Sequence, residues 1–158
     1  MPQTTDDARI AGLSPLIAPA ILAEELPSSD AATKTVTRAR SETEAILSGN
    51  DDRLLVVVGP CSIHDTDAAL EYASRLKSCI NRLNHELAIV MRVYFEKPRT
   101  TIGWKGLIND PTLDNTFDIN KGLRMARGLL LKLAELDIPA GSEFLDVVTP
   151  QYIADLIS

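Results

Sequence analysis

Cys61 and His64 are the first pair of residues in this sequence whose types and spacing could do chemistry. They follow the apolar run 54–58 and the dipeptide Gly59-Pro60. A cysteine after a strand can act as a thiolate nucleophile or a soft metal ligand, and Cys-x-x-His resembles half of a metal site. Metal sites need three or four ligands, so one such pair is weak support. A buried thiol beside a helix-capping His64-Asp65 pair explains the same residues, and both interpretations stand at this point.

The segment from Arg92 to Lys105 carries a local positive charge in an acidic chain. Four cations, Arg92, Lys97, Arg99 and Lys105, stand there against one anion, Glu96, whereas the whole chain has a net charge of -6. Arg92 follows an apolar run, where a cation without an anion to pair with would be costly. Residues 97–101 (KPRTT) place an ammonium, a guanidinium and two hydroxyls within a short stretch, which suits phosphate. A solvated charged loop is the alternative, but phosphorylated or carboxylated small substrates are favoured.

Glu143 and Asp146 are a third candidate, in the string Glu143-Phe144-Leu145-Asp146. Paired carboxylates can do acid–base work. One of them could instead cap the next helix, before which Thr149 is a suitable cap and Pro150 a suitable first residue. The sequence leaves both interpretations open.

The elements that must position these residues alternate between strands and helices. The apolar runs Leu54–Val58 and Leu87–Met91, the second continuing to Phe95, are typical of strands buried on both faces of a parallel sheet. A short third strand is expected at Gly141–Leu145, and helices are expected at 66–83, from Asp118 onwards, and at 150–157. The class is therefore α/β, either a doubly wound fold or part of an eightfold barrel. In both, sites form at the carboxyl ends of the strands, where all three candidates lie.

The first 50 residues have a different texture, with four prolines and only short apolar stretches. They predict an extended arm with one short helix, then a helix from about Lys34 to Leu47 that Gly49-Asn50 ends. We therefore expect two regions, an N-terminal arm over 1–50 and a domain over 51–158.

Composition excludes several classes of partner. A net charge of -6 argues against nucleic acid and against a membrane surface, since both need a basic face. The sequence shows no secretory signal and no apolar run of about 18 residues. Its two cysteines, Cys61 and Cys79, do not form a disulfide framework. We expect a soluble cytoplasmic protein.

Four strings of the sequence resemble the feedback-regulated bacterial and fungal 3-deoxy-D-arabino-heptulosonate-7-phosphate (DAHP) synthases. They are 54–65 (LLVVVGPCSIHD), 91–101 (MRVYFEKPRTT), 103–111 (GWKGLINDP) and 143–146 (EFLD). The resemblance implies a (β/α)8 TIM barrel that condenses phosphoenolpyruvate with erythrose 4-phosphate, releases phosphate, and opens the shikimate pathway to the aromatic amino acids. A barrel needs about 250 residues. The chain would therefore be an N-terminal fragment with the first three or so βα units, inactive by itself.

The resemblance also implies roles for single residues. Cys61 matches a ligand of a divalent metal ion (Mn, Fe, Co or Zn), and His64 has no ligand role in that pattern. Arg92 and Lys97 match the phosphoenolpyruvate site, with Lys97 also the expected catalytic residue. Arg99 and Thr100 match the erythrose 4-phosphate site, and Glu143 lies near the same pocket.

The arm acquires a regulatory and oligomerisation role from the same resemblance. In similar enzymes it crosses to another subunit of a homo-oligomer, a dimer or tetramer at full length, and helps to form an aromatic amino-acid feedback site. The matching residues are Asp6, Asp7, Phe144, Asp146, Pro150 and Gln151.

Two alternatives remain. The related synthase that uses arabinose 5-phosphate lacks the long arm and the full KPRTT-x-GW pattern. A truncated, non-catalytic partial barrel that only associates with full-length subunits would also fit a chain with one expected metal ligand. The coding sequence beyond Ser158 would distinguish that alternative from the enzyme.

Overall fold

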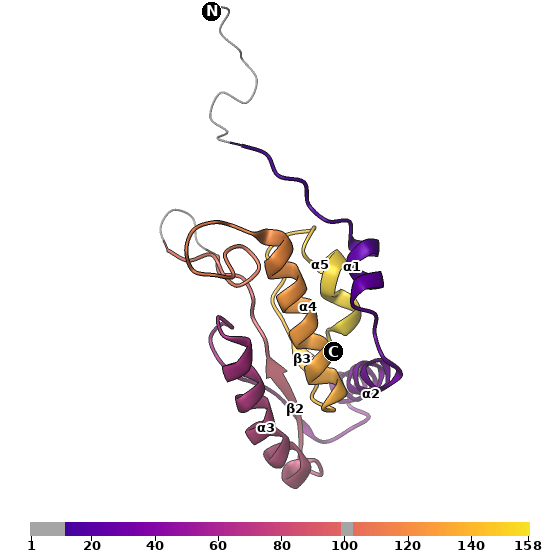
Figure 1. Cartoon of the computed structure of the whole chain (residues 1–158). Coiled ribbons are helices and arrows are strands. Elements are labelled where there is room, and N and C mark those ends of the chain that lie inside the picture. The colour runs from indigo at the N-terminus through magenta and orange to yellow at the C-terminus, as the bar shows by residue number, and fades with distance from the viewer. Residues whose placement is uncertain (1–11, 99–102) are drawn as a thin grey trace, which may run out of the picture.

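The computed structural model describes residues 12–98 and 103–158 (Figure 1). The elements, in chain order, are α1 (Pro19–Glu25), α2 (Asp30–Leu47), β1 (Leu54–Val58), α3 (Thr66–Leu83), β2 (Leu87–Arg92), α4 (Ile119–Glu135), β3 (Ala140–Gly141), α5 (Pro150–Ile153) and the 3-10 turn η1 (Ala154–Leu156). The strands form one parallel sheet in the order β1-β2-β3. This confirms the predicted α/β class.

The first strand is more open than its sequence predicted. Leu54 is 65% exposed and Val57 is 55% exposed, although both belong to a β-branched apolar run. β1 pairs only with β2, from Leu54↔Leu87 to Val58↔Met91, so it lies at the edge of the sheet. The expectation of burial on both faces is therefore wrong for β1. It is right for the interior of β2, which has neighbours on both sides.

The second and third strands are shorter than predicted. β2 ends at Arg92 and not at Phe95; beyond it, the carbonyl oxygen of Tyr94 accepts a hydrogen bond from Ile63 in a loop. β3 is only Ala140–Gly141, so the strand expected at 141–145 is wrong beyond its first residue. The chain leaves the sheet there and runs into the turn before α5.

Helices α3 and α4 flank β2 in Figure 1 and pack against each other. Their sequence-predicted starts are confirmed. The Asp65 carboxylate accepts hydrogen bonds from the Asp67 and Ala68 amides at 2.8 and 3.0 Å, and Asp118 accepts from the Lys121 amide at 3.1 Å. Such caps satisfy amides that have no partner within a helix. The core lies between these helices and the sheet face that carries Ile89 and Met91.

Helix α2 begins at Asp30, four residues before the predicted start, because the Ser29 hydroxyl caps it by accepting from the Ala32 amide at 3.2 Å. Its end is as predicted. Gly49 has a φ of 74°, and the Asn50 amide donates to the Ala45 carbonyl at 2.8 Å. That left-handed glycine is a common way to end a helix.

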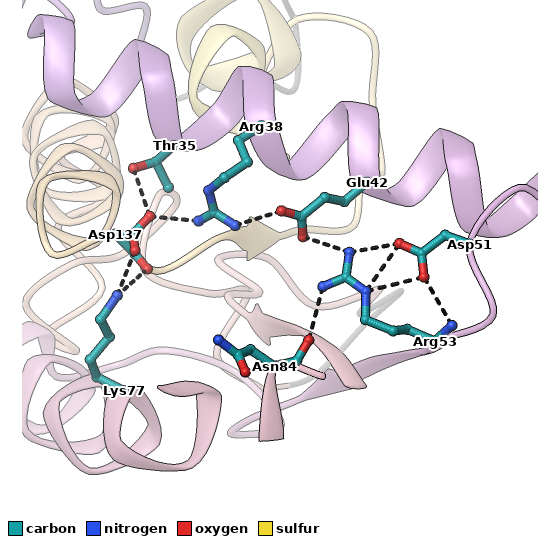
Figure 2. Close-up of polar contacts among 8 residues, drawn as sticks. All are labelled: Thr35, Arg38, Glu42, Asp51, Arg53, Lys77, Asn84 and Asp137. Carbon is teal, nitrogen blue, oxygen red and sulfur yellow. Dashed lines mark hydrogen bonds and ion pairs between the residues drawn. The ribbon is translucent and has the colours of Figure 1, made fainter. Parts of the chain in front are cut away.

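Polar contacts join α2 to the rest of the molecule at Asp137, just after α4 (Figure 2). The Asp137 carboxylate accepts from Arg38 of α2 and from Lys77 of α3, the latter at 2.7 Å. The Thr35 hydroxyl donates to the Ala134 carbonyl at 2.7 Å. Partial burial acts to raise the pKa of Asp137, but the hydrogen bonds and charges of Lys77 and Arg38 hold it below its ordinary value. Three helices thus meet at one carboxylate.

Arg127 of α4 joins the segment after α1 to the last helix. Its side chain is 2% exposed. It donates to the Leu26 carbonyl at 2.8 Å, to the Tyr152 carbonyl at 2.9 Å, and to both oxygens of Asp155 at 2.7 and 2.9 Å. The helix predicted over 150–157 is here a four-residue helix followed by a 3-10 turn, so that prediction was too long. None of the helices in the described ranges is long and apolar enough to cross a membrane.

Candidate active site

A cavity of about 220 Å³ lies where the chain leaves β1 and β2. Its lining residues come from the end of β2 and from the loops after β1, β2 and β3, and are Cys61, Arg92, Tyr94, Glu96, Lys97, Pro98 and Glu143. Four residues singled out from the sequence therefore meet in one place, as their positions after parallel strands predicted. The predicted erythrose 4-phosphate residues, Arg99 and Thr100, lie outside the described residues.

A second cavity, of about 200 Å³, lies near the amino ends of the strands and is also lined by arginines. Its Arg38 pairs with Glu42 and Asp137, and its Arg53 pairs with Asp51, as Figure 2 shows. These cations are already neutralised by carboxylates, so the cavity offers little to an anionic ligand. The cavity at the carboxyl ends is the better candidate.

The loop after β1 passes closely against β2. A Cβ atom at Gly59 would lie 2.7 Å from the carbonyl oxygen of Arg92, so a side chain there would force the two segments apart. The Ile63 amide donates to the Tyr94 carbonyl at 2.8 Å and fixes the far side of the loop. Cys61 lies between these two contacts and is exposed toward the cavity. The thiol can therefore reach a ligand in the cavity, and the buried-thiol interpretation is wrong for Cys61.

Arg92 is the last residue of β2, and its guanidinium has two described contacts. Its Nη2 donates to the carbonyl oxygen of Cys61 at 3.2 Å, and its Cζ lies 3.9 Å from the centre of the Tyr94 ring. Its Nε is buried and has no hydrogen-bond partner among the described residues. Because a buried donor without a partner is costly, this atom favours an anionic ligand in the cavity.

Lys97 is held at the cavity by a short antiparallel contact. Its amide donates to the Lys105 carbonyl at 2.9 Å, and Glu96 forms an isolated bridge with Gly106. Gly106 has a φ of 117°, and a Cβ there would lie 2.1 Å from the Phe95 carbonyl oxygen. Only glycine fits this position.

Glu96 and Tyr94 line the cavity although they are not among the site residues expected from the sequence. For Tyr94, a position two residues from Arg92 on an extended segment was the available signal, since it predicts the same face. Glu96 was counted only as the anion among four cations. Its side chain is buried; one oxygen accepts from Asn109 at 3.2 Å and the other, Oε2, has no partner in the described part of the chain. The sequence did contain a signal for Glu96, because a carboxylate that directly follows the apolar residue Phe95 is a candidate for burial.

Burial raises the pKa of Glu96 above its ordinary value, and the negative charge of Asp146 adds to this effect. The hydrogen bond that Asn109 donates to Glu96 acts in the opposite direction but is weaker than burial. The cavity therefore contains a carboxyl group that takes up a proton more readily than a free glutamate.

Asp146 has a structural role in the turn before α5. It accepts from the Val148 and Thr149 amides, each at 2.7 Å, and from the Thr149 hydroxyl at 2.9 Å. These bonds hold the pKa of Asp146 below its ordinary value, although burial acts against them. The Thr149 hydroxyl is thus hydrogen-bonded to Asp146 and does not cap α5, contrary to the prediction. Of the two carboxylates, only Glu143 lines the cavity.

The other predicted feedback residues lie in the same turn and at the start of α5. Phe144 is 42% exposed, Pro150 is the first residue of α5, and Gln151 donates to the Val147 carbonyl at 3.1 Å. Asp6 and Asp7 fall outside the described residues.

Cys61 is the candidate metal ligand that the cavity presents. Within residues 12–98 and 103–158, no three His, Cys, Asp or Glu side chains are placed so that they could hold a metal ion together. His64 is exposed, and Asp65 is engaged as the cap of α3. The exposed Cys61 thiol is chemically suited to a divalent transition metal, with further ligands from elsewhere.

Comparison with known proteins finds relatives over nearly the whole chain. The model of the DAHP synthetase I family matches residues 31–158. A phospho-2-dehydro-3-deoxyheptonate aldolase of Amycolatopsis methanolica is 60% identical, with 97% of this chain and 75% of that protein covered. The Phe-sensitive enzyme of Escherichia coli K12 is also 60% identical, with 97% of this chain but 44% of that protein covered. The tyrosine-inhibited enzyme of Candida albicans is 51% identical, with 43% of its length covered.

A solved structure gives the same result for the fold. The phospho-2-dehydro-3-deoxyheptonate aldolase of Francisella tularensis SCHU S4 superposes with a TM-score of 0.91 at 54% identity, over 94% of this chain and 43% of that one. The chain thus spans less than half the length of several relatives that it matches. With a family match over residues 31–158 and these relatives, the chain belongs to the DAHP synthetase I family.

Proposed function

We propose that this chain forms one wall of the active site of a DAHP synthase, which condenses phosphoenolpyruvate with erythrose 4-phosphate. The observation that carries the proposal is the cavity in which Arg92 and Lys97 meet Cys61, with no carboxylate paired to either cation among the described residues. Both substrates are multiply charged anions. Fixed cations in a partly dry pocket hold such groups together and stabilise charge that develops between them.

The reaction forms a bond from C3 of phosphoenolpyruvate to the aldehyde carbon of erythrose 4-phosphate. The oxygen of a water molecule bonds to C2, and one of its protons ends on the aldehyde oxygen. The C2–O bond to phosphate then breaks, phosphate leaves with the second proton, and C2 becomes a ketone. We assign Arg92 and Lys97 to phosphoenolpyruvate, because a guanidinium fork and a point charge suit its carboxylate and phosphate. Lys97 is our candidate catalytic residue, Glu143 adds a polar group to the pocket, and Arg99 and Thr100 are assigned to erythrose 4-phosphate.

The fold supports a partial (β/α)8 barrel. Three parallel strands in sequential order, joined through α3 and α4, are the arrangement that the first units of such a barrel would have. A Cβ at Gly141 would contact the side chains of Val90 and Val57, so this face of the sheet would be the barrel interior. Further strands would cover the exposed edge of β1. Since the chain covers 44% of the E. coli relative, we assign the activity to a polypeptide of that length.

We propose Cys61 as one ligand of a divalent metal ion, with the others on strands that follow. When bound, the metal would polarise the aldehyde or activate water. The candidate metals are Mn, Fe, Co and Zn; the thiolate favours the softer of these ions, and oxygen ligands from the later strands would favour Mn.

Feedback by an aromatic amino acid is the regulatory part of the proposal. Relatives are named Phe-sensitive, tyrosine-inhibited and Trp-sensitive. We assign Phe144, Asp146, Pro150 and Gln151 to the ligand site, and Asp6 and Asp7 to an arm from another subunit of a homo-oligomer. The arm would comprise residues 1–50 and the catalytic domain would begin at 51, in a cytoplasmic enzyme.

The test is turnover by the full-length protein that contains this chain. Phosphate release is measured with both substrates, after treatment with EDTA and after each divalent metal is restored. Turnover should need both substrates and metal, and should fall by more than about 100-fold in Arg92→Ala and Lys97→Ala. Lys132→Ala, which removes an exposed cation of α4, is the matched control. Absence of turnover by the full-length protein with every metal would overturn the proposal. Co-purification of the 158-residue chain with an active full-length subunit would favour the non-catalytic partial barrel.

A further inference from the structure

The Tyr94 ring and the Arg92 guanidinium form a stack at the mouth of the candidate cavity. β-Strand geometry places every second residue on one face, so the two side chains leave the same side of this extended segment. Val90, two residues earlier, faces Gly141 and Val57 on that side. The stack therefore stands at the carboxyl end of the proposed barrel interior, beside Lys97.

Two contacts fix the position of the guanidinium. The Tyr94 ring covers one of its faces, with 3.9 Å from Cζ to the ring centre. The carbonyl oxygen of Cys61 accepts from its Nη2 at 3.2 Å. The buried Nε has no partner in the described part of the chain, so the chain leaves part of the hydrogen-bonding capacity of the guanidinium unused.

Tyr94 is itself held in place by backbone contacts. Its carbonyl oxygen accepts from the Ile63 amide at 2.8 Å, and the close approach at Gly59 presses the same loop against Arg92. The ring, the guanidinium and the loop of Cys61 are therefore linked by direct contacts across the ends of β1 and β2.

We infer that Tyr94 is a positioning residue that sets the plane of the Arg92 guanidinium for bidentate binding of phosphoenolpyruvate. The inference rests on the proposed function. A planar fork recognises carboxylate or phosphate only when its donors point at the oxygens, and an arginine without the ring samples other rotamers. The aromatic face acts through cation–π attraction, which phenylalanine also supplies. The hydroxyl of Tyr94 has no part in it.

The experiment compares Tyr94→Phe and Tyr94→Leu in the metal-loaded full-length protein. Tyr94→Leu should raise KM for phosphoenolpyruvate about tenfold, equivalent to about 1.4 kcal/mol. Its kcat should change less than about twofold, because the loss concerns binding shared by ground and transition states. Tyr94→Phe should restore the wild-type KM. Tyr72→Leu, which removes a half-buried ring of α3 outside the cavity, should also leave KM unchanged.

A second measurement separates this inference from the proposed function. The dissociation constant for phosphoenolpyruvate is measured by calorimetry without erythrose 4-phosphate, so it does not depend on turnover. Equal constants for the wild type and Tyr94→Leu would overturn the positioning role even in an active enzyme. A loss of phosphoenolpyruvate affinity in Tyr94→Phe as large as that in Tyr94→Leu would also overturn the positioning role, since the hydroxyl would then contact the substrate. Absence of wild-type turnover contradicts the reaction itself.

A double-mutant cycle completes the test. In an Arg92→Lys background, Tyr94→Leu should lower the affinity for phosphoenolpyruvate by less than about twofold, because this background has no guanidinium for the ring to stack on. Additive losses would show that the ring acts through another group. If Tyr94→Leu fails to fold, as judged by its thermal transition, Tyr94→Met fills more of the volume and takes its place.

Discussion

Glu96 and Gly106 face each other in an isolated antiparallel bridge, and this pairing returns the chain over the carboxyl end of β2. The bridge lies next to the bond from the Lys97 amide to the Lys105 carbonyl, at 2.9 Å. The conformation of Gly106 thus decides where Glu96 and Lys97 lie relative to the cavity.

Gly106→Ala should therefore lower both stability and activity. The new Cβ would lie 2.1 Å from the Phe95 carbonyl oxygen at a φ of 117°, and strain of this kind costs about 2 to 3 kcal/mol. Chemical denaturation and KM for phosphoenolpyruvate are the measurements. Gly128→Ala in α4 is the control, because its Cβ meets nothing within 4 Å. Alanine in a helix interior should stabilise by about 0.5 to 1 kcal/mol. A Gly106→Ala protein as stable as the wild type would contradict the prediction.

Asp155→Asn should destabilise the protein by about 2 kcal/mol at neutral pH, because it weakens the pairing of the buried Arg127. Half of the Asp155 side chain is exposed, so the loss is smaller than for a fully buried pair. The hydrogen bonds and charge of Arg127 outweigh burial and hold the pKa of Asp155 below its ordinary 3.8.

The same pairing predicts a pH dependence. A carboxyl with a lowered folded-state pKa stabilises fully above 3.8, and this contribution disappears as the pH falls through the lower folded value. Urea unfolding at pH 7 and at stepwise lower pH should therefore show the wild type and Asp155→Asn converging below 3.8. A constant difference over that range would exclude Asp155 ionisation as the cause.

Glu96→Gln should stabilise the protein at pH 7. Burial raises the pKa of Glu96 above its ordinary 4.5, so the ionised carboxylate destabilises the folded state above the raised value. Below 4.5 the group is protonated both folded and unfolded, and the advantage of glutamine disappears. Thermal unfolding at pH 4 and pH 7 measures this, with Glu86→Gln as the exposed control. A variant less stable than the wild type at pH 7 would mean that ionised Glu96 has a partner beyond the described residues.

Cys61→Ser should weaken metal binding in the full-length protein at least about tenfold, since a hydroxyl is a poor substitute for a thiolate. Metal content after dialysis, measured by atomic absorption, gives the result without reference to activity. Cys79→Ser, which changes a half-buried thiol of α3, should retain the metal. Equal retention by both variants would remove Cys61 from the ligand set.

The sequence by itself determined the local elements with strong signals. Helix α3 has its predicted bounds, because Asp65 caps its start and an apolar stripe runs along it to Leu83. The order of strands and helices predicted a parallel sheet with the site at its carboxyl edge, and Cys61, Arg92, Lys97 and Glu143 do meet there. These results follow from the spacing of apolar, capping and polar residues along the chain, which can be read directly from the sequence.

Tertiary structure decided what depends on neighbours distant in sequence. β1 is exposed because it has a strand on one side only, and β3 is short because the chain turns toward Asp146. Three further features depend on packing: Glu96 is buried, Arg127 pairs with Asp155, and Tyr94 stacks on Arg92. No local sequence pattern predicts the energy of these interactions. Burial and charge pairing are properties of the packed molecule, so the electrostatic character of the cavity could be determined only after folding.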